Sequence, residues 1–301
     1  MLQEPSVSIN FVEPRLGGIK ISSYLKLCRP KQWIKNLLVF AVPLASKDIF
    51  ELRVFLDCLV AFVSFILASS SVYAWNDIRD REEDKLHPVK ASRPVASGAI
   101  GVWPAACISV SLIALSLILA WYFGNINLVV VVIVYLFTQV LYQLRLRDIP
   151  LFDIAIISSG FVLRAIAGGL AAGIFISVWF LSVTASASLF IVGAKRYSEM
   201  IRNSESEANR KVLLEYTSTY LRLVWSSSLV STVTFYALWS AEVQISSDSM
   251  ISKYSVIPFL FLFLRYAIYA DKGEAESPEV IVFADRGIQL LAVIWALTFL
   301  I

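Results

Sequence analysis

Long apolar segments separated by short polar connections dominate this chain. Nine such segments can be distinguished, and most are about 20 residues long, the length that an α-helix needs to cross the hydrocarbon core of a bilayer. They cover residues 33–46, 54–75, 104–123, 126–144, 151–172, 177–194, 213–241, 253–270 and 283–301. The pattern predicts an all-α integral membrane protein with nine transmembrane helices in a single bundle.

Two segments depart from the simple pattern. Segment 33–46 is short and contains Pro43, which predicts a kinked or tilted first helix. Segment 213–241 is long and rich in Ser and Thr, which can form hydrogen bonds between helices in a membrane. We expect residues 1–20 to form a polar tail and residues 21–301 to form one transmembrane domain.

Composition and loop charge extend this prediction. The chain is 58% hydrophobic and 16% charged, whereas a soluble domain carries about 25% charged residues. Most of the 26 lysines and arginines lie in the N-terminal region and in the loops after the second, fourth, sixth and eighth segments, while the opposite loops contain only Lys47, Arg53 and Lys253. Because basic loops remain in the cytoplasm, we expect a cytoplasmic N-terminus, a C-terminus on the far side and location in the inner (plasma) membrane.

The densest charge in the chain directly follows the second segment, in the run Asn76-Asp77-Ile78-Arg79-Asp80-Arg81-Glu82-Glu83-Asp84. If the run is helical, Asp77, Asp80 and Asp84 occupy positions i, i+3 and i+7 on one face. Carboxylate and amide oxygens suit Mg²⁺, which proteins bind through one or two carboxylates plus substrate phosphates. The run predicts a cytoplasmic Mg²⁺–diphosphate site. Its metal ligands would be Asn76, Asp77, Asp80 and Asp84, and the three aspartates are the predicted catalytic residues.

Two groups of cations flank this run and are predicted to bind phosphate. Lys85, Lys90 and Arg93 follow it, and Lys and Arg are the usual phosphate partners; the alternative is a solvated charged loop. The second group lies before the first segment, where Lys31 and Lys35, like Gln32 and Asn36, are one α-helical turn apart. The resulting polar stripe could reach a phosphate, or the segment could simply flank the membrane with basic residues and an interfacial Trp.

Two further clusters are candidates for substrate binding. Asp148 and Asp153 form a sparser acidic pair before and at the start of the fifth segment, and the alternative is acids favoured by the helix dipole. Arg164, three turns after Asp153, is costly in lipid and should face a cavity or form a structural ion pair. The last cluster, Lys195-Arg196-Tyr197, is either a cationic wall for phosphate or a cytoplasmic anchor in which Lys195 pairs with Glu199.

The acidic run matches the NDxxDxxxD motif of the UbiA superfamily of intramembrane prenyltransferases. Other segments resemble the decaprenyl-phosphate phosphoribosyltransferase branch: RPKQWIKN (29–36), HPVKASRP (87–94), GFVLRA (160–165) and KRYSE (195–199). This resemblance extends from about residue 24 to the end. It implies nine transmembrane helices around a central cavity that opens to the cytoplasm. One departure is the second acidic pair, Asp148 and Asp153, which is one residue wider than the family's DxxxD motif.

The resemblance implies a Mg²⁺-dependent glycosyltransferase that moves 5-phosphoribose from 5-phosphoribosyl-1-diphosphate to a polyprenyl (decaprenyl) phosphate. Pyrophosphate would be released, and the product would serve synthesis of cell-wall arabinan precursors. The large number of cations favours this reaction over the alternative, transfer of a prenyl group from a prenyl diphosphate to an aromatic acceptor. A transporter or lipid scaffold would not need a metal-spaced acidic triad. We expect no nucleic-acid partner; a homo-oligomer is compatible with the sequence, which does not set the lipid length.

Overall fold

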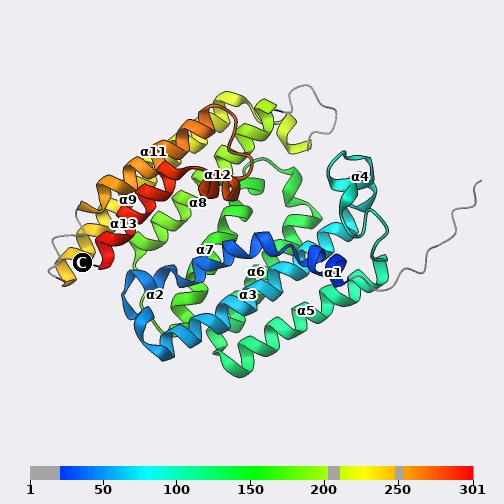
Figure 1. Cartoon of the computed structure of the whole chain (residues 1–301), viewed down its shortest axis with the longest axis horizontal. Helices are drawn as coiled ribbons and strands as arrows, with labels where there is room; N and C mark the ends of the chain where they lie inside the picture. The colour runs from blue at the N-terminus through cyan, green and yellow to red at the C-terminus, as the bar shows by residue number, and fades with distance from the viewer. Residues whose placement is uncertain (1–20, 203–210, 248–253, 301) are drawn as a thin grey trace, which may run out of the picture.

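The computed structural model describes residues 21–202, 211–247 and 254–300, and all regular elements in these ranges are helices (Figure 1). The predicted polar tail, residues 1–20, lies outside the described residues. The long helices are α3 (Leu52–Arg79), α5 (Val102–Phe123), α6 (Ile126–Leu144), α7 (Phe152–Ala172), α8 (Val178–Arg202), α9 (Ser218–Ser247), α11 (Val256–Asp271) and α13 (Arg286–Leu300). The short ones are α1 (Ile21–Cys28), η1 (Pro30–Phe40), α2 (Ala41–Ala45), η2 (Asp48–Phe50), α4 (Arg81–Leu86), η3 (Lys90–Ser92), η4 (Leu146–Asp148), η5 (Lys211–Leu214) and α12 (Pro278–Ala284).

The predicted count of nine membrane helices is only partly reproduced. In the described part of the chain, α3, α5, α6, α7 and α8 are long and apolar enough to cross a membrane, and α12 with α13 would make a sixth span that bends by 84°. The predicted spans 213–241 and 253–270, which correspond to α9 and α11, do not meet the criteria of length and hydropathy. Ser and Thr lower the hydropathy of α9, and α11 has only 16 residues. The chain is a multi-pass membrane protein, with at least five such helices.

The first predicted span has an unusual form. It is not a kinked α-helix but the 11-residue 3₁₀-helix η1 followed by the five-residue α2, which contains Pro43. A 3₁₀-helix rises about 2.0 Å per residue, so η1 is roughly 22 Å long, and α2 adds roughly 7.5 Å at 1.5 Å per residue. The pair therefore reaches about 30 Å, the thickness of a bilayer's hydrocarbon core.

The 3₁₀ form also decides which side chains of η1 face which neighbour, because residues three apart lie in one row. One row is buried: Trp33 Nε1 donates to Ser70 Oγ of α3 (3.1 Å), and Asn36 Nδ2 donates to Ser69 Oγ (3.3 Å). Val39, next in this row, is fully buried in the core between η1, α3, α6 and α7. The sequence analysis paired residues four apart, as in an α-helix, so it missed this arrangement.

Packing against α7 is close enough to require glycine. A Cβ added to Gly168 would overlap the backbone carbonyl oxygen of Val39. The far end of α7 is also fixed, because Gly173 ends it in the left-handed conformation (φ 69°) that glycine adopts without strain. Asn125 then caps α6 by accepting a hydrogen bond from the Leu128 amide (2.9 Å) and donates to the carbonyl of Leu170 (3.0 Å).

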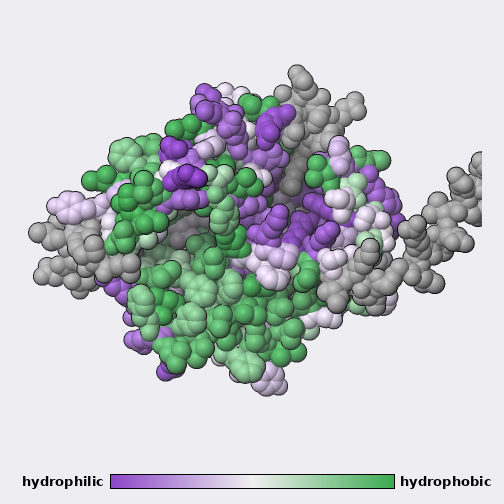
Figure 2. Space-filling model, viewed as in Figure 1, coloured by the Kyte–Doolittle hydropathy of each residue, from purple (hydrophilic) through white to green (hydrophobic). Residues whose placement is uncertain are grey.

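The surface divides into polar and apolar regions. Figure 2 shows hydrophilic residues gathered toward α4 and α12, whereas hydrophobic residues cover the part of the molecule built from α3 and α5. Large apolar side chains remain exposed on α5 and α6, such as Val110 (62% exposed) and Ile118 (51%). Apolar side chains in this position are those expected to contact lipid, so the polar end marks the membrane surface.

We expect Gly168→Ala to lower the free energy of unfolding in detergent by about 3 kcal/mol, because η1 must move away from α7 to make room for the methyl group. Thermal unfolding of the purified protein measures this loss. The matched control is Gly160→Ala in the same helix, where the added Cβ meets no backbone atom: its nearest neighbours are the side chains of Arg164 at 3.3 Å and of Gln139 and Tyr135 at 3.7 Å. Equal melting temperatures for the two variants would show that η1 does not pack on Gly168.

Candidate active site

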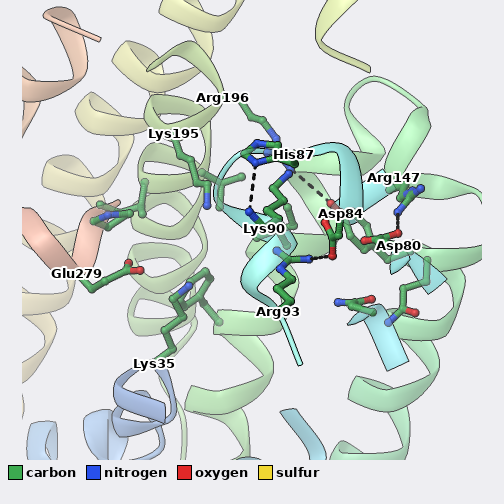
Figure 3. A pocket seen from close by; sticks show the side chains of 18 of the residues that line it. Lys35, Asp80, Asp84, His87, Lys90, Arg93, Arg147, Lys195, Arg196 and Glu279 are labelled. Atoms are coloured by element: carbon green, nitrogen blue, oxygen red, sulfur yellow. Dashed lines mark hydrogen bonds and ion pairs between the residues drawn. The ribbon is translucent and has the colours of Figure 1, made fainter. Parts of the chain in front are cut away.

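A cavity of about 1010 Å³ lies at the polar end of the bundle, between α3, α4, α6, η4 and α7 on one side and η1, α8 and α12 on the other (Figure 3). About half of the residues predicted from the sequence line it: Lys35, Asn76, Asp80, Asp84, Lys90, Arg93, Asp148, Lys195 and Arg196. The others lie outside its lining: Lys31, Gln32, Asn36, Asp77, Lys85, Asp153, Arg164 and Tyr197. Residues from distant parts of the chain therefore form one chamber.

The acidic run is helical, as its spacing predicts, with one break. Helix α3 ends at Arg79 and α4 begins at Arg81, but the helical hydrogen bonding continues on both sides of the break. The Asp80 amide donates to the Asn76 carbonyl (2.9 Å), and the Asp84 amide donates to the Asp80 carbonyl (2.8 Å). The run thus presents Asn76, Asp80 and Asp84 to the cavity from consecutive turns.

Each of the three aspartates forms an ion pair with an arginine. Arg29 hydrogen-bonds to Oδ1 of Asp77, Arg93 to Asp84 (2.6 Å) and Arg147 to Asp80 (2.8 Å). Arg93 also approaches Asp77 at 3.8 Å and so joins two of the aspartates. Arg29 and Arg147 were not among the predicted site residues, although Arg29 begins the RPKQWIKN segment and Arg147 directly precedes Asp148.

The oxygen atoms of Asn76, Asp77, Asp80 and Asp84 suit a hard divalent cation, although arginines pair with the three carboxylates in this structure. Among the described residues, no three acidic, His or Cys side chains are placed to hold a metal ion as they stand. However, Asp77 is only 1% exposed, and its Oδ2 has no hydrogen-bond partner in the described structure. A buried carboxylate oxygen without a partner is costly, and a cation would satisfy it. The residues present therefore fit a Mg²⁺ site, and the ligand assignments remain predictions.

Arg29 reaches Asp77 because the chain turns sharply between α1 and η1. It has a left-handed conformation (φ 51°), which is rare for a residue other than glycine, and its guanidinium lies 5.1 Å from the ring centroid of Tyr73. Backbone conformations of this kind persist only where surrounding contacts hold them. The ion pair with Asp77 and the contact with Tyr73 are such contacts.

The opposite wall carries two lysines that the sequence analysis named and one carboxylate, Glu279, that it did not. Figure 3 shows Lys35 of η1, Lys195 of α8 and Glu279 of α12 on the side of the cavity away from Asp80 and Arg147. The Glu279 Oε1 accepts a hydrogen bond from Gln32 Nε2 (3.0 Å). Gln32 and Lys35 are three residues apart and share a row of η1, so the 3₁₀ form turns both toward this side.

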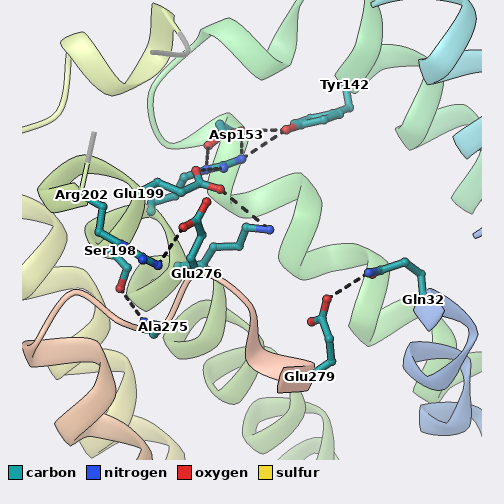
Figure 4. Close-up of polar contacts among 11 residues, drawn as sticks. Gln32, Tyr142, Asp153, Ser198, Glu199, Arg202, Ala275, Glu276 and Glu279 are labelled. Atoms are coloured by element: carbon teal, nitrogen blue, oxygen red, sulfur yellow. Dashed lines mark hydrogen bonds and ion pairs between the residues drawn. The ribbon is translucent and has the colours of Figure 1, made fainter. Parts of the chain in front are cut away.

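Arg196 lines the cavity but is already fully engaged in a buried network with Asp153 and Glu199, both labelled in Figure 4. It is 1% exposed and donates to both oxygens of Asp153 (2.6 and 2.8 Å) and to Glu199 (2.5 Å). The Tyr142 hydroxyl donates to Asp153 as well (2.9 Å), so the network joins α6, α7 and α8. Asp153, fully buried, holds Arg196 in this structure. The phosphate contacts predicted for Arg196 and Asp153 remain predictions.

Arg164 is buried beneath the cavity rather than exposed in it. Its guanidinium donates to Asn36 Oδ1 (2.7 Å), to the Gly160 carbonyl (2.6 Å) and to the Tyr135 hydroxyl (3.3 Å). Three aromatic rings also lie within 6 Å of it, the nearest being that of Tyr135 at 5.0 Å. Arg164 therefore ties η1 to α7, and the ion pair offered as its alternative role is not among the contacts that the described residues make.

Three further predicted residues lie away from the cavity. Lys85 bonds to Glu82 on the exposed side of α4 (2.9 Å), and Lys31 is exposed on η1. The Tyr197 hydroxyl is buried and accepts a hydrogen bond from Arg222 (2.8 Å). Substrate contacts for these three residues stay predictions, since each lies outside the cavity lining.

Other lining residues were missed, and only some carried a sequence signal. Glu83 and His87 belong to segments already noted, but Tyr142, Gln143 and Glu279 stand in or beside apolar stretches without any motif. Gln143 is 5% exposed, and its Oε1 has no hydrogen-bond partner in the described structure. It is thus an acceptor at the cavity wall that a bound molecule could satisfy.

Two pKa shifts outside the membrane helices follow from these contacts. Burial alone would lower the pKa of Arg147, but the hydrogen bond and the charge of Asp80 outweigh burial, so the pKa is raised. Arg147 therefore keeps its charge at any physiological pH. On the exposed side of α4, the hydrogen bond from Lys85 lowers the pKa of Glu82 below its ordinary value.

Comparison with known proteins identifies the family of this chain. The family model described as the UbiA prenyltransferase family matches residues 37–284. The chain belongs to the UbiA prenyltransferase family. It is 42% identical over 277 residues to the decaprenyl-phosphate phosphoribosyltransferase of Corynebacterium glutamicum, covering 90% of this chain and 83% of that protein. It is 43% identical over 298 residues to the enzyme of the same name from Mycolicibacterium smegmatis, covering 94% and 93%.

Solved structures of UbiA proteins share the fold. A UbiA homologue from Archaeoglobus fulgidus bound to DMAPP and Mg²⁺ superposes with a TM-score of 0.72, covering 92% of this chain and 98% of that one. The same homologue bound to GPP and Mg²⁺ gives a TM-score of 0.71. The sequence identity is 19% in both cases, so this likeness establishes the UbiA fold for the chain and nothing finer.

We expect Arg196→Met to lower the free energy of unfolding by about 3–5 kcal/mol, because it leaves the fully buried carboxylate of Asp153 without its cation and Glu199 with only the more distant Lys195 (3.8 Å). Thermal unfolding in detergent measures the effect. Arg202→Met is the matched control, since Arg202 is 60% exposed and its pair with Glu276 contributes about 0–1 kcal/mol. If both variants melt like the wild type, the buried network does not stabilise the bundle.

Proposed function

We propose that this protein transfers 5-phosphoribose from 5-phosphoribosyl-1-diphosphate to a polyprenyl phosphate and releases pyrophosphate. The observation that carries the proposal is the 42–43% identity, over most of both chains, to proteins named decaprenyl-phosphate phosphoribosyltransferase. The cavity supports it independently, because its two walls provide cations for several phosphates. By analogy with those relatives, the acceptor is decaprenyl phosphate and the product serves cell-wall arabinan synthesis.

The charges of the cavity match this pair of substrates. The donor has a diphosphate at ribose C1 and a phosphate at C5, and the acceptor brings another phosphate. Cations stand on both walls, with Lys90, Arg93 and Arg147 near the acidic run and Lys35 and Lys195 across from it. Two separated groups of cations suit a molecule with phosphates at both ends.

Asn76, Asp77, Asp80 and Asp84 would hold Mg²⁺. When bound, the ion supplies charge neutralisation for the diphosphate, as it does in other phosphate enzymes. For Asp77 and Asp84 to accept a metal, Arg29 and Arg93 must exchange carboxylate oxygens for phosphate oxygens. Guanidinium binds both groups with the same bidentate geometry, so this exchange keeps the charges paired.

The transfer itself needs few protein groups. The C1–O bond to the diphosphate breaks with its electron pair leaving on pyrophosphate, and oxocarbenium character develops at C1. A phosphate oxygen of the lipid then forms the new bond to C1. Arg93 and Arg147, which line the cavity, would neutralise the departing pyrophosphate electrostatically. The lipid phosphate is already ionised at pH 7, so no side chain must remove a proton.

The polar end of the bundle would lie on the cytoplasmic side of the inner (plasma) membrane. The basic loops support this orientation, with the N-terminus inside, the C-terminus outside and nine crossings in total. The reach of η1 with α2 and the bent pair of α12 and α13 are compatible with crossings beyond the five long helices. In this orientation the cavity faces the compartment that holds phosphorylated sugars and Mg²⁺, and the polyprenyl tail lies along the apolar face.

Prenyl transfer is the second candidate, because the structural neighbour from Archaeoglobus fulgidus was bound to DMAPP and Mg²⁺. One assay separates the two reactions. Purified protein with Mg²⁺ receives either labelled phosphoribosyl diphosphate with decaprenyl phosphate, or a labelled prenyl diphosphate with an aromatic acid. We expect a lipid-linked phosphoribose from the first mixture. A product only from the second mixture would establish prenyl transfer instead.

We expect Asp80→Asn to reduce turnover at least about 100-fold and removal of Mg²⁺ with EDTA to abolish it, because Asp80 faces the cavity and would lose its charge toward the metal. Asp77→Asn should have the same effect. The matched control is Glu82→Gln, which changes an exposed carboxylate of the same run. Thermal unfolding verifies that the variants fold. If Asp80→Asn turned over substrate as fast as the wild type, the acidic run would not be the catalytic metal site.

A further inference from the structure

Glu279 is a carboxylate in a cavity whose proposed substrates are anions. It lines the cavity from α12, on the wall of Lys35 and Lys195, and lies across from the acidic run (Figure 3). Asp77, Asp80 and Asp84 each pair with an arginine, whereas the hydrogen-bond partner of Glu279 is the neutral amide of Gln32 (3.0 Å; Figure 4). Lys35 and Lys195 on the same wall attract this carboxylate electrostatically, but as an anion it repels phosphate and would bind a different part of the substrate.

Ionised carboxylates offer about four lone-pair positions, and Gln32 occupies one of those of Glu279. The side chain is half-buried, and the rest of it is available to the cavity. A ligand that satisfies it must therefore bring hydrogen-bond donors. Ionised phosphates supply only acceptors, but the ribose of the proposed donor has hydroxyl groups at C2 and C3.

The segment that carries Glu279 is fixed at both ends. Before α12, the Ala275 amide donates to the buried Ser198 Oγ of α8 (3.0 Å; Figure 4). After it, the Asp285 carboxylate accepts hydrogen bonds from Arg265 (2.8 Å) and from the amide of Gly287 (2.7 Å) at the 84° bend into α13. A side chain on an element held this way keeps its position, as recognition of a small group requires.

We propose that Glu279 accepts a hydrogen bond from a ribose hydroxyl of the donor and is therefore a specificity-determining residue that selects a sugar diphosphate over a prenyl diphosphate. This inference rests on the proposed phosphoribosyl transfer. A prenyl chain has no donor for Glu279, so binding one would leave a desolvated carboxylate unsatisfied. Sites built to bind a hydroxyl reject analogues that lack it for this reason.

The test measures kcat/KM with phosphoribosyl diphosphate and with its 2-deoxy and 3-deoxy counterparts, always with decaprenyl phosphate as acceptor. Wild type is compared with Glu279→Ala and with the isosteric Glu279→Gln. The matched control is Glu276→Gln, a partly exposed carboxylate that precedes α12 and pairs with Arg202 outside the cavity lining. For each variant we take the ratio of kcat/KM with the full donor to kcat/KM with each deoxy donor. Comparing this ratio between variant and wild type cancels the intrinsic reactivity of each donor.

We expect Glu279→Ala to reduce the preference over at least one deoxy donor by about 10- to 100-fold, the usual effect of a hydrogen bond to a charged group. Glu279→Gln should fall between Ala and the wild type, and Glu276→Gln should match the wild type. If the Glu279 variants lose activity equally with all donors, Glu279 only positions Gln32 and the inference is wrong. If the wild type does not use phosphoribosyl diphosphate at all, the proposed function is wrong as well.

Discussion

The pairing of each aspartate in the acidic run with an arginine is the interaction on which this site depends. Buried carboxylates at a membrane edge are stable only with a cation in contact. The three arginines come from different places: Arg29 from the turn after α1, Arg93 from the loop after η3 and Arg147 from η4. The ion pairs therefore join the turn after α1, the loop after η3 and η4 to the end of α3 and to α4, and they shape the cavity before any substrate enters.

These pairs differ in kind from the network around Arg196. In that network one guanidinium satisfies two carboxylates and a tyrosine hydroxyl in nearly complete burial, so exchange with a ligand would leave several groups unpaired. By contrast, Arg93 and Arg147 are about a quarter exposed and line the cavity. Burial thus distinguishes the two sets of arginines: Arg93 and Arg147 can be reached from the cavity, whereas Arg196 is enclosed by its partners.

The acidic run, the positions of most helices and the family were predictable from the sequence, because each depends on local spacing or on motifs. The contacts of Arg29 and Glu279 were not predictable. Arg29 contacts Asp77, 48 residues away in the sequence, and Gln32 contacts Glu279, 247 residues away. No local sequence pattern indicates contacts between residues so far apart in the chain. Arg196 was grouped with phosphate ligands because its partners on α6 and α7 could not be seen. The row of Gln32 and Lys35 was missed because an α-helical period was assumed.

The 3₁₀ form of η1 affects both the length of this segment and the direction of its side chains toward the cavity. Wound as an α-helix, its 11 residues would be roughly 16.5 Å long instead of roughly 22 Å, too short, with α2, to match a hydrocarbon core of about 30 Å. The same winding would rotate Lys35 by about 60° around the helix axis relative to Gln32. The pitch of η1 therefore sets both the length of this segment and the alignment of Lys35 with Gln32 on the cavity wall.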